Sequence, residues 1–277
     1  MLARVANNLF WMGRYIERAE HLARYLNVNY FSSLDAPNEF SQSRQFVLRS
    51  MMFFVGEPIH DRSVVLNEEE VLYNIGLNSD MPYSIINNVK YARENANSAR
   101  DLISTELYEA INKFYHFVVN YCKDDFKKKG LYDFTMNIAE MTAILRGKIR
   151  GTLLHDEVYA IIMLGINLER ATQVIRIINS KYNDAVESKG NFGDKISNSF
   201  EWITLLKCVE SYDMMRRFYK KTPNSICTLE FLILNPDCPR SVINSINQVY
   251  KHIKVLDESK NPEKNSTAFL ISRIKGE

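Results

Sequence analysis

One helical pattern occurs twice in the sequence, and it constrains the fold of the chain more than any other feature. Residues 9–27, LFWMGRYIERAEHLARYLN, align without a gap with residues 161–179, IIMLGINLERATQVIRIIN, at an offset of 152 residues. Both copies contain a glycine, a Glu-Arg-Ala triplet, a later arginine and a final asparagine. The matching residues are Gly13/Gly165, Glu17/Glu169, Arg18/Arg170, Ala19/Ala171, Arg24/Arg176 and Asn27/Asn179.

The apolar positions of both copies recur every three or four residues, which is the spacing of one helix face. They are Leu9, Met12, Ile16, Ala19, Ala23 and Leu26 in the first copy, and Ile161, Leu164, Leu168, Ala171, Ile175 and Ile178 in the second. We therefore expect two related halves with a pseudo-two-fold repeat. Each half would be built around a helix that carries a Glu-Arg pair beside its buried face.

Helical patterns continue through the rest of the chain. The expected helices span about residues 2–30, 39–54, 81–103, 106–122, 131–154, 156–182, 197–219, 224–234 and 239–257, with a further helix that starts at 67 and a glycine-bearing loop at 188–194. The apolar stripe of 81–103 continues in register through Ala110 and Phe117, so 104–105 is either a break or part of one longer helix. Asn67, Ser104 and Asp156 are expected N-caps, and Pro82 is expected in a first turn. Strand alternation is absent, so the predicted fold is all-α. We expect an antiparallel helical bundle that forms a single domain over residues 1–277.

Composition and charge exclude several classes of protein. A formal net charge of +2 gives no electrostatic reason to bind nucleic acid or anionic lipid. The four cysteines form no C-x-x-C pair, which predicts reduced packing residues in a cytoplasmic protein. No apolar run approaches membrane-spanning length, and no signal-peptide core is apparent at the N-terminus. A cytoplasmic location is therefore predicted.

Glycine accompanies the glutamate in both copies of the repeat. Gly13 and Gly165 each lie four residues before it, although glycine within a helix costs about 1 kcal/mol relative to alanine. Either a carboxylate that reaches across to a facing helix or a closely packed backbone needs this space. By the same reasoning Gly147 and Gly151, one turn apart, predict a close helix contact.

Two interpretations of the Glu-Arg pairs remain open at this point. In the structural one, Glu17 pairs with Arg170 and Glu169 pairs with Arg18 across the repeat, or each pairs with arginines from other helices. In the functional one, the two copies line a polar pocket for an anionic or amide ligand. The structural interpretation is favoured, because ion-pair networks perturb charged groups without forming active sites.

Metal and catalytic signatures are absent from the sequence. The only Glu-x-x-His spacing, Glu57 to His60, contains a proline, and the second copy has Gln173 in place of His21. No phosphate-binding, dinucleotide-binding or nucleophile-elbow motif is present. We therefore predict no metal, no cofactor and no catalytic residue.

Several stretches resemble the bacterial alpha-E domain family, in the order in which the family has them. They are NLFWMGRYIERAEHLARYL, YARENANSARDLISTELYEAIN, LGINLERATQVIRII and LEFLILNPDCPRSVINSI, and the resemblance covers nearly the whole chain. By motif position it assigns a set of polar residues to a binding site or a buried network. These are Glu17, Arg18, Arg93, Glu94, Asn95, Arg100, Glu106, Glu169, Arg170 and Arg240.

The resemblance also implies a context. It associates the chain with an ATP-grasp type ligase and a transglutaminase-like protein, and hence with peptide synthesis or modification, with a peptide as a further candidate ligand. Three hypotheses follow: a non-catalytic accessory or binding protein, an enzyme with a Glu/Arg site acting on a peptide or amide, and a structural scaffold with buried ion pairs. A homodimer is compatible with the last hypothesis.

Overall fold

The computed structural model describes residues 1–32, 43–126, 130–188, 196–257 and 266–276, and these residues form helices with no β-strand. The prediction of an all-α fold is confirmed. The helices are α1 (Ala3–Ser32), α2 (Arg44–Val55), α3 (Glu68–Gly76), α4 (Ile85–Ser98), η1 (Arg100–Leu102, a 3₁₀-helix), α5 (Thr105–Val119), α6 (Lys123–Asp125), α7 (Leu131–Thr152), α8 (Glu157–Ser188), α9 (Ile196–Cys208), α10 (Tyr212–Tyr219), α11 (Ser225–Leu234), α12 (Val242–Leu256) and α13 (Thr267–Lys275).

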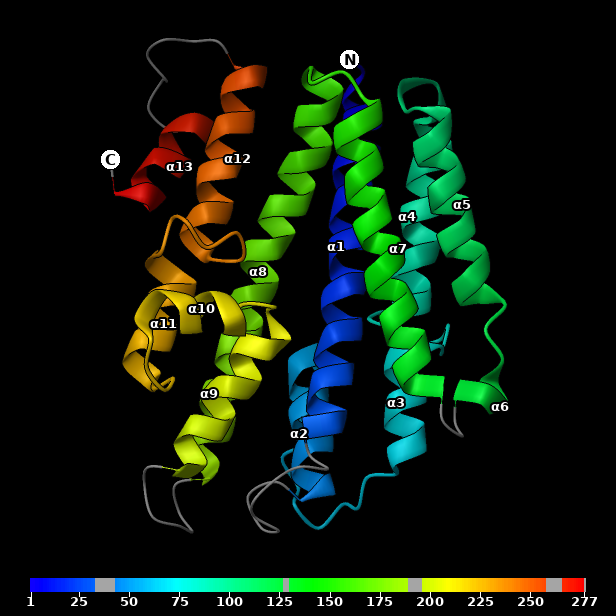
Figure 1. The fold of residues 1–277 in the computed structure, drawn as a ribbon. Helices are drawn as coiled ribbons and strands as arrows, with labels where there is room; N and C mark the ends of the chain where they lie inside the picture. The colour runs from blue at the N-terminus through cyan, green and yellow to red at the C-terminus, as the bar shows by residue number, and fades with distance from the viewer. Residues whose placement is uncertain (33–42, 127–129, 189–195, 258–265, 277) are drawn as a thin grey trace.

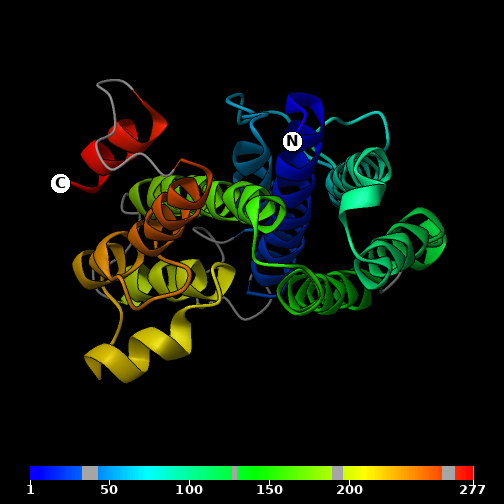
Figure 2. The same ribbon diagram turned by 90° about the horizontal axis from the view of Figure 1, so that it is seen from above.

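The two longest helices, α1 and α8, lie side by side at the centre of the fold (Figures 1 and 2). Helix α1 also contacts α4 and α7 on one side, and α2 and α9 near its C-terminal half. On its other side α8 contacts α12, α9 and α2. The two repeat segments therefore form the core to which the other helices attach.

Helices α1 and α8 run parallel to each other, contrary to the prediction of an antiparallel bundle. Contacts between them keep a nearly constant offset, from Phe10 with Gly165 to Tyr25 with Ser180. Helices α4, α5 and α7, which are connected through the short η1 and α6, alternate in direction (Figure 1). Short connections impose antiparallel neighbours, whereas the long crossover from α1 to α8 allows a parallel pair.

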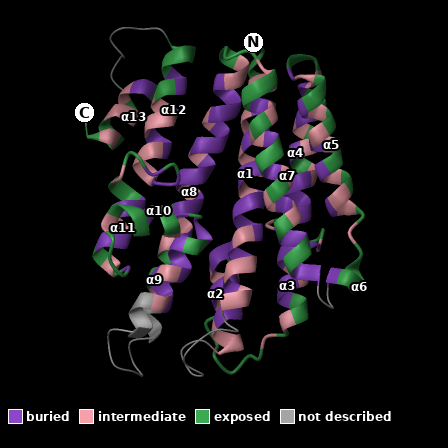
Figure 3. Cartoon of the chain, in the orientation of Figure 1, coloured by how far each residue is buried: buried purple, intermediate pink, exposed green. Residues whose placement is uncertain are grey.

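Burial confirms the buried face expected for the first copy, but the second copy does not bury all of the residues expected. All six apolar residues from Leu9 to Leu26 are buried. In the second copy Ile175 is 51% exposed, and Leu164 and Leu168 pack against a separate apolar cluster that includes Val249 and Ile253. Because α8 contacts helices on several sides, its buried residues extend beyond one face (Figure 3).

The glycines of the repeat mark the point where the two backbones meet. A methyl group on Gly165 would lie 2.1 Å from the carbonyl oxygen of Phe10, and one on Gly13 would lie 2.5 Å from that of Ile162. Of the two explanations offered for these glycines, the closely packed backbone is correct. Gly147 and Gly151 have no neighbour within 4 Å of such a methyl group, so the close contact expected there is wrong.

Side-chain caps start several helices where the sequence indicates. Asn67 accepts a hydrogen bond from the Glu70 amide, Ser104 from that of Leu107, and Asp156 from that of Val158. Pro82, by contrast, lies in a turn before α4, which begins at Ile85 with Ser84 as its N-cap. The helix expected over 81–103 therefore starts later and ends at Ser98, before η1.

Two further boundaries differ from prediction. The helix expected over 197–219 is interrupted after Cys208, and Glu210 adopts the left-handed backbone conformation there with φ of 55°. Ser188, the first residue of the loop expected at 188–194, is the last residue of α8, and the rest of that loop lies outside the described residues, as does the start of the helix expected at 39. Three of the cysteines are buried as expected, but Cys122 is exposed.

Helix α8 also meets the length and composition of a membrane span. Residues Glu157–Asp184 pass that test, contrary to the prediction that no segment approaches it, but 67% of the apolar window is buried inside the protein. A buried core helix meets the same criteria. Its contacts with α1 and α12 place it in the core.

We expect Gly165→Ala to destabilise the protein by about 1–3 kcal/mol, because the added methyl group would overlap the Phe10 backbone. Gly151→Ala is the matched control. It lies in an open helical position, where alanine gains up to about 1 kcal/mol over glycine. Urea denaturation of both variants measures the difference, and equal stabilities would show that α1 and α8 do not pack as described.

Candidate functional site

Charged side chains gather between α1 and α8 and form what we call the central ion-pair network. Helix α1 supplies half of the members, α8 supplies a Glu-Arg pair and a glutamine, and single residues come from α7 and from the turns before α10 and α12. The members are Arg14, Glu17, Arg18, Glu20, His21, Arg24, Arg146, Glu169, Arg170, Gln173, Glu210 and Arg240.

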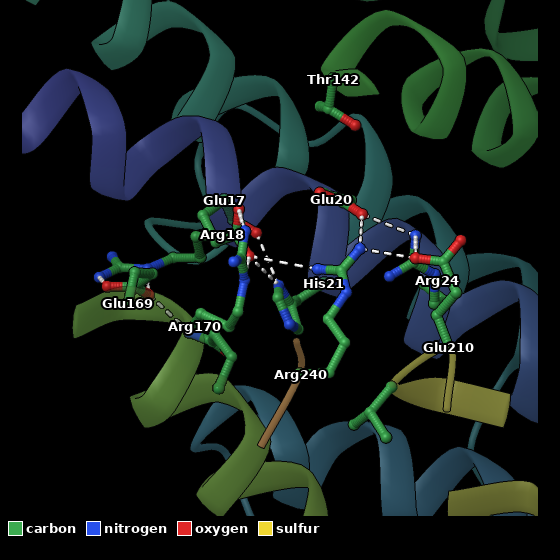
Figure 4. Close-up of polar contacts among 12 residues, drawn as sticks. Glu17, Arg18, Glu20, His21, Arg24, Thr142, Glu169, Arg170, Glu210 and Arg240 are labelled. Carbon is green, nitrogen blue, oxygen red and sulfur yellow. Dashed lines mark hydrogen bonds and ion pairs between the residues drawn. The ribbon is translucent and has the colours of Figure 1, made fainter. Parts of the chain in front are cut away.

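Each Glu-Arg pair of one helix bonds to the pair of the other, as Figure 4 shows. Arg170 donates to Glu17 through Nε at 2.6 Å and Nη2 at 3.1 Å. Arg18 donates to Glu169 through Nε at 2.6 Å and Nη2 at 3.0 Å. Both contacts are bidentate, the geometry in which guanidinium and carboxylate bind most strongly. The reciprocal exchange predicted from the repeat is present.

A second arginine binds each of these glutamates, but the two come from different places. Arg14, one turn before Arg18, donates to Glu169 at 2.6 Å. The corresponding residue of the second copy is Ile166, and Glu17 is instead contacted by Arg240 at 3.3 Å. The turn before α12 therefore supplies the positive charge that α8 lacks.

The residue four positions after each glutamate folds back toward it. Gln173 donates to Glu169 at 2.7 Å, and the Nδ1 atom of His21 lies 3.7 Å from Glu17. His21 Nδ1 is also 2.9 Å from the Glu17 carbonyl oxygen, so the neutral ring carries its proton on Nδ1. The His21 Nε2 atom is buried and has no hydrogen-bond partner among the described residues.

Glu20 extends the network toward the C-terminal half of α1. Arg240 donates to it at 2.9 Å, Arg24 donates at 2.6 Å, and Arg146 of α7 contacts its other oxygen. Glu210 then binds both Arg24 and Arg240, at 3.1 and 2.6 Å, from a side chain that is 58% exposed. Glu20 thus links α1, α7 and the turn before α12.

Burial and charge act in opposite directions on the pKa values of these glutamates. Burial raises the pKa of Glu17, Glu20 and Glu169, but the neighbouring guanidinium groups outweigh it and hold each pKa below the usual 4.5. The main partners are Arg170 for Glu17, Arg240 for Glu20 and Arg18 for Glu169. Burial lowers the pKa of His21 below 6.5. The three carboxylates are therefore charged and His21 is neutral near pH 7.

Five of the ten site residues named from the family resemblance meet in this network: Glu17, Arg18, Glu169, Arg170 and Arg240. The other five lie along the α4–η1–α5 segment, on the opposite side of α1 from α8, and are partly or fully exposed (Figures 1 and 3). They are Arg93, Glu94, Asn95, Arg100 and Glu106. The structure therefore divides the predicted site into a buried part and a surface part.

Local contacts hold the surface part in place. Arg93 donates to Asn112 at 2.8 Å and lies over the Tyr115 ring. Arg100 lies over the Tyr108 ring and donates to the Ile103 carbonyl at 3.3 Å. These contacts fix the angle between α4 and α5 and leave polar groups at the surface.

Sequence reasoning missed several members of the network. Glu20 and Arg24 carry a signal, since they stand four residues apart on the face that bears Glu17. Arg14 also carries one, because it lies one turn before Arg18. Nothing in the sequence indicates Arg146 or Glu210 as members, because only the packing of α7 and of the turn after α9 brings them to α1.

Three hollows in the described part of the chain lie away from the reciprocal pairs. One of about 330 Å³ lies beside α2, one of about 230 Å³ between α5 and α7, and one of about 570 Å³ near the start of α1. The linings contain neither Glu17 nor Glu169. Nor do the described residues contain a group of three or more His, Cys, Asp or Glu side chains that could hold a metal ion.

The fold and this network define a class of protein: an all-α domain whose central helices are joined by paired Glu-Arg motifs. The chain belongs to the Alpha-E family, whose sequence model matches residues 1–277. The family is described as a predicted alpha-helical domain with a conserved ER motif, which is the dipeptide found at Glu17-Arg18 and Glu169-Arg170. Comparisons with curated proteins and with solved structures found no match.

Replacing Glu17 with glutamine should destabilise the protein by about 3–5 kcal/mol, because Arg170 would lose its buried carboxylate. Glu94→Gln is the matched control on the exposed side of α4, where we expect a change within about 0.5 kcal/mol. Chemical denaturation compares the two. If Glu17→Gln were as mild as the control, the pair would not be structural.

The lowered pKa values of Glu17, Glu20 and Glu169 predict a loss of stability in acid. Unfolded glutamates bind protons near pH 4.5, whereas the folded ones do so only at lower pH. Their contribution is therefore complete above about pH 5 and is lost as the pH falls through the folded pKa values. Urea denaturation between about pH 6 and pH 3 measures this. Glu169→Gln should flatten the dependence, and a wild-type curve independent of pH would contradict the assignment.

Proposed function

We propose that the protein is a non-catalytic helical accessory protein that binds partner proteins through its α4–η1–α5 surface. The partners that we infer are an ATP-grasp type peptide ligase and a transglutaminase-like protein, in peptide synthesis or modification. Their identities rest on the family resemblance. The observation that supports a binding role is the division of the site residues between a buried network and an exposed surface.

The state of the buried carboxylates weighs against the enzyme hypothesis. Arginines occupy both oxygens of Glu17 and both oxygens of Glu169. A general acid or base needs a pKa near the working pH and access to substrate, whereas these groups have lowered pKa values and are fully buried. The scaffold hypothesis accounts for the network, and the exposed residues then remain for binding.

The surface part of the site offers polar groups beside two hollows. Glu106 lines the hollow between α5 and α7, together with the apolar Met141 and Ile144. Arg100 lines the larger hollow near the start of α1, which also contains the exposed Leu2 and Leu102. Apolar contact surface bordered by charge is the composition of a protein-binding surface.

We also propose that the chain arose by duplication of one helical half. The reciprocal pairing supports this, since Glu17–Arg170 and Arg18–Glu169 exchange equivalent residues across two parallel helices. The equivalent glycines at the close approach support it too. Free cysteines support a cytoplasmic location as a further proposal.

Co-purification with the ATP-grasp partner tests the binding role. We expect the tagged protein to retain the ligase in mild salt, and we expect Glu106→Lys to reduce the retained amount by about tenfold, as reversal of a contact charge does. Asp213→Lys is the matched control, since it makes the same change at an exposed site on α10. Both proteins eluting as independent species by size-exclusion chromatography, or equal loss in both variants, would contradict the proposal.

A further inference from the structure

A second buried polar cluster, separate from the central network, underlies the hollow beside α2. Lys181 donates to Asp184 Oδ2 at 2.7 Å, and the Ser50 hydroxyl donates to the same oxygen at 2.7 Å. The Tyr25 hydroxyl lies 2.8 Å from Ser50 Oγ and 2.7 Å from Ser180 Oγ. Burial lowers the pKa of Lys181, but Asp184 outweighs it and raises the pKa well above 10.5, so the lysine is charged.

Ser50 and Asp184 form the floor of the hollow. Both are only 4% exposed. Asp184 uses Oδ2 for both of its hydrogen bonds, and Oδ1 has no hydrogen-bond partner among the described residues. Because Asp184 lines the hollow, Oδ1 is the oxygen that a ligand there would meet. A carboxylate oxygen available at the base of a concave site binds a hydrogen-bond donor, most strongly a cationic one.

The walls of the hollow are largely apolar, with His60 and Asn183 as their polar members. Phe46 and Phe53 of α2 face Pro58 and Ile59 of the segment that follows α2. The volume is about 330 Å³. It lies at the lower end of the range of about 300–1,000 Å³ that holds small-molecule ligands. Such walls bind an aliphatic or aromatic side chain.

The rim of the hollow is positively charged. Arg49 donates to the backbone carbonyls of Ile59, Asp61, Arg62 and Val64 and so holds the wall segment in position. The Ser63 hydrogen bonds and the charge of Arg49 lower the pKa of the Asp61 carboxylate, which does not itself line the hollow. Arg62 lines the same rim. The hollow therefore has a negative floor, apolar walls and a positive rim.

We propose that this hollow binds a free amino acid with a large apolar side chain. Its ammonium group would bind Asp184, its side chain would pack against Phe46 and Phe53, and its carboxylate would face Arg49 and Arg62. The site has a carboxylate at its floor and guanidinium groups at its rim, which match the ammonium and carboxylate groups of a zwitterion. A simple amine would make no contact with the rim arginines, and a simple acid would place its carboxylate beside that of Asp184. This site lies apart from the α4–η1–α5 surface, and the proposal does not depend on the proposed partners.

Three ligands of one shape test the assignment on the wild-type protein. L-phenylalanine carries both charges, 2-phenylethylamine only the ammonium group, and 3-phenylpropionate only the carboxylate. By calorimetry we expect phenylalanine to bind about tenfold or more tightly than 3-phenylpropionate, as loss of a charge-assisted hydrogen bond implies. The amine should bind with intermediate affinity. No binding of phenylalanine, or equal binding of it and either analogue, would overturn the proposal.

Two variants locate the binding. Asp184→Asn should weaken phenylalanine binding by about tenfold or more. Because that change also removes a partner of Lys181, Arg62→Gln provides a second test at the exposed rim. It should weaken phenylalanine by about twofold to fivefold and leave 2-phenylethylamine unchanged. Arg150→Gln, an exposed arginine of α7, is the matched control. Equal effects of Arg62→Gln and Arg150→Gln on phenylalanine would place the ligand elsewhere.

Discussion

The reciprocal Glu-Arg pairs between α1 and α8 are the interaction on which the rest of the structure depends. A buried glutamate is costly unless its charge is paired, and each of these two is paired with two arginines. Removing Glu17, for example, would leave Arg170 without its carboxylate partner in the core. The pairs thereby fix which face of α8 contacts α1 and the position of one helix along the axis of the other. Apolar contacts alone would specify this register far less strictly.

The close approach of the two backbones makes this pairing geometry available. Gly13 and Gly165 let the helices meet one turn before the glutamates, so short bidentate contacts can form without extended side chains. The two helices run parallel, which places Gly13 beside Ile162 and Ile166, and Gly165 beside Phe10. The long crossover through α2–α7 provides that orientation.

The network also organises the periphery. Arg240 joins the turn before α12 to both Glu17 and Glu20, and Arg146 joins α7 to Glu20. Ion pairs thus connect segments on both sides of the core to α1. These carboxylates are occupied and buried, so the binding sites that we propose lie at the surface: the α4–η1–α5 face and the hollow above Ser50 and Asp184.

The sequence by itself determined the all-α class, the caps at Asn67, Ser104 and Asp156 and the buried face of α1, and it offered the exchange of Glu-Arg partners as one of its alternatives. Those features depend on spacing within a helix or on a repeated motif, and both are visible in one dimension. Tertiary structure decided the parallel orientation, the recruitment of Arg146 and Arg240 to Glu20 and of Glu210 to Arg240, and the surface position of Arg93 and Glu106. These depend on which distant helix packs where, and for that the pattern along the chain carries no signal.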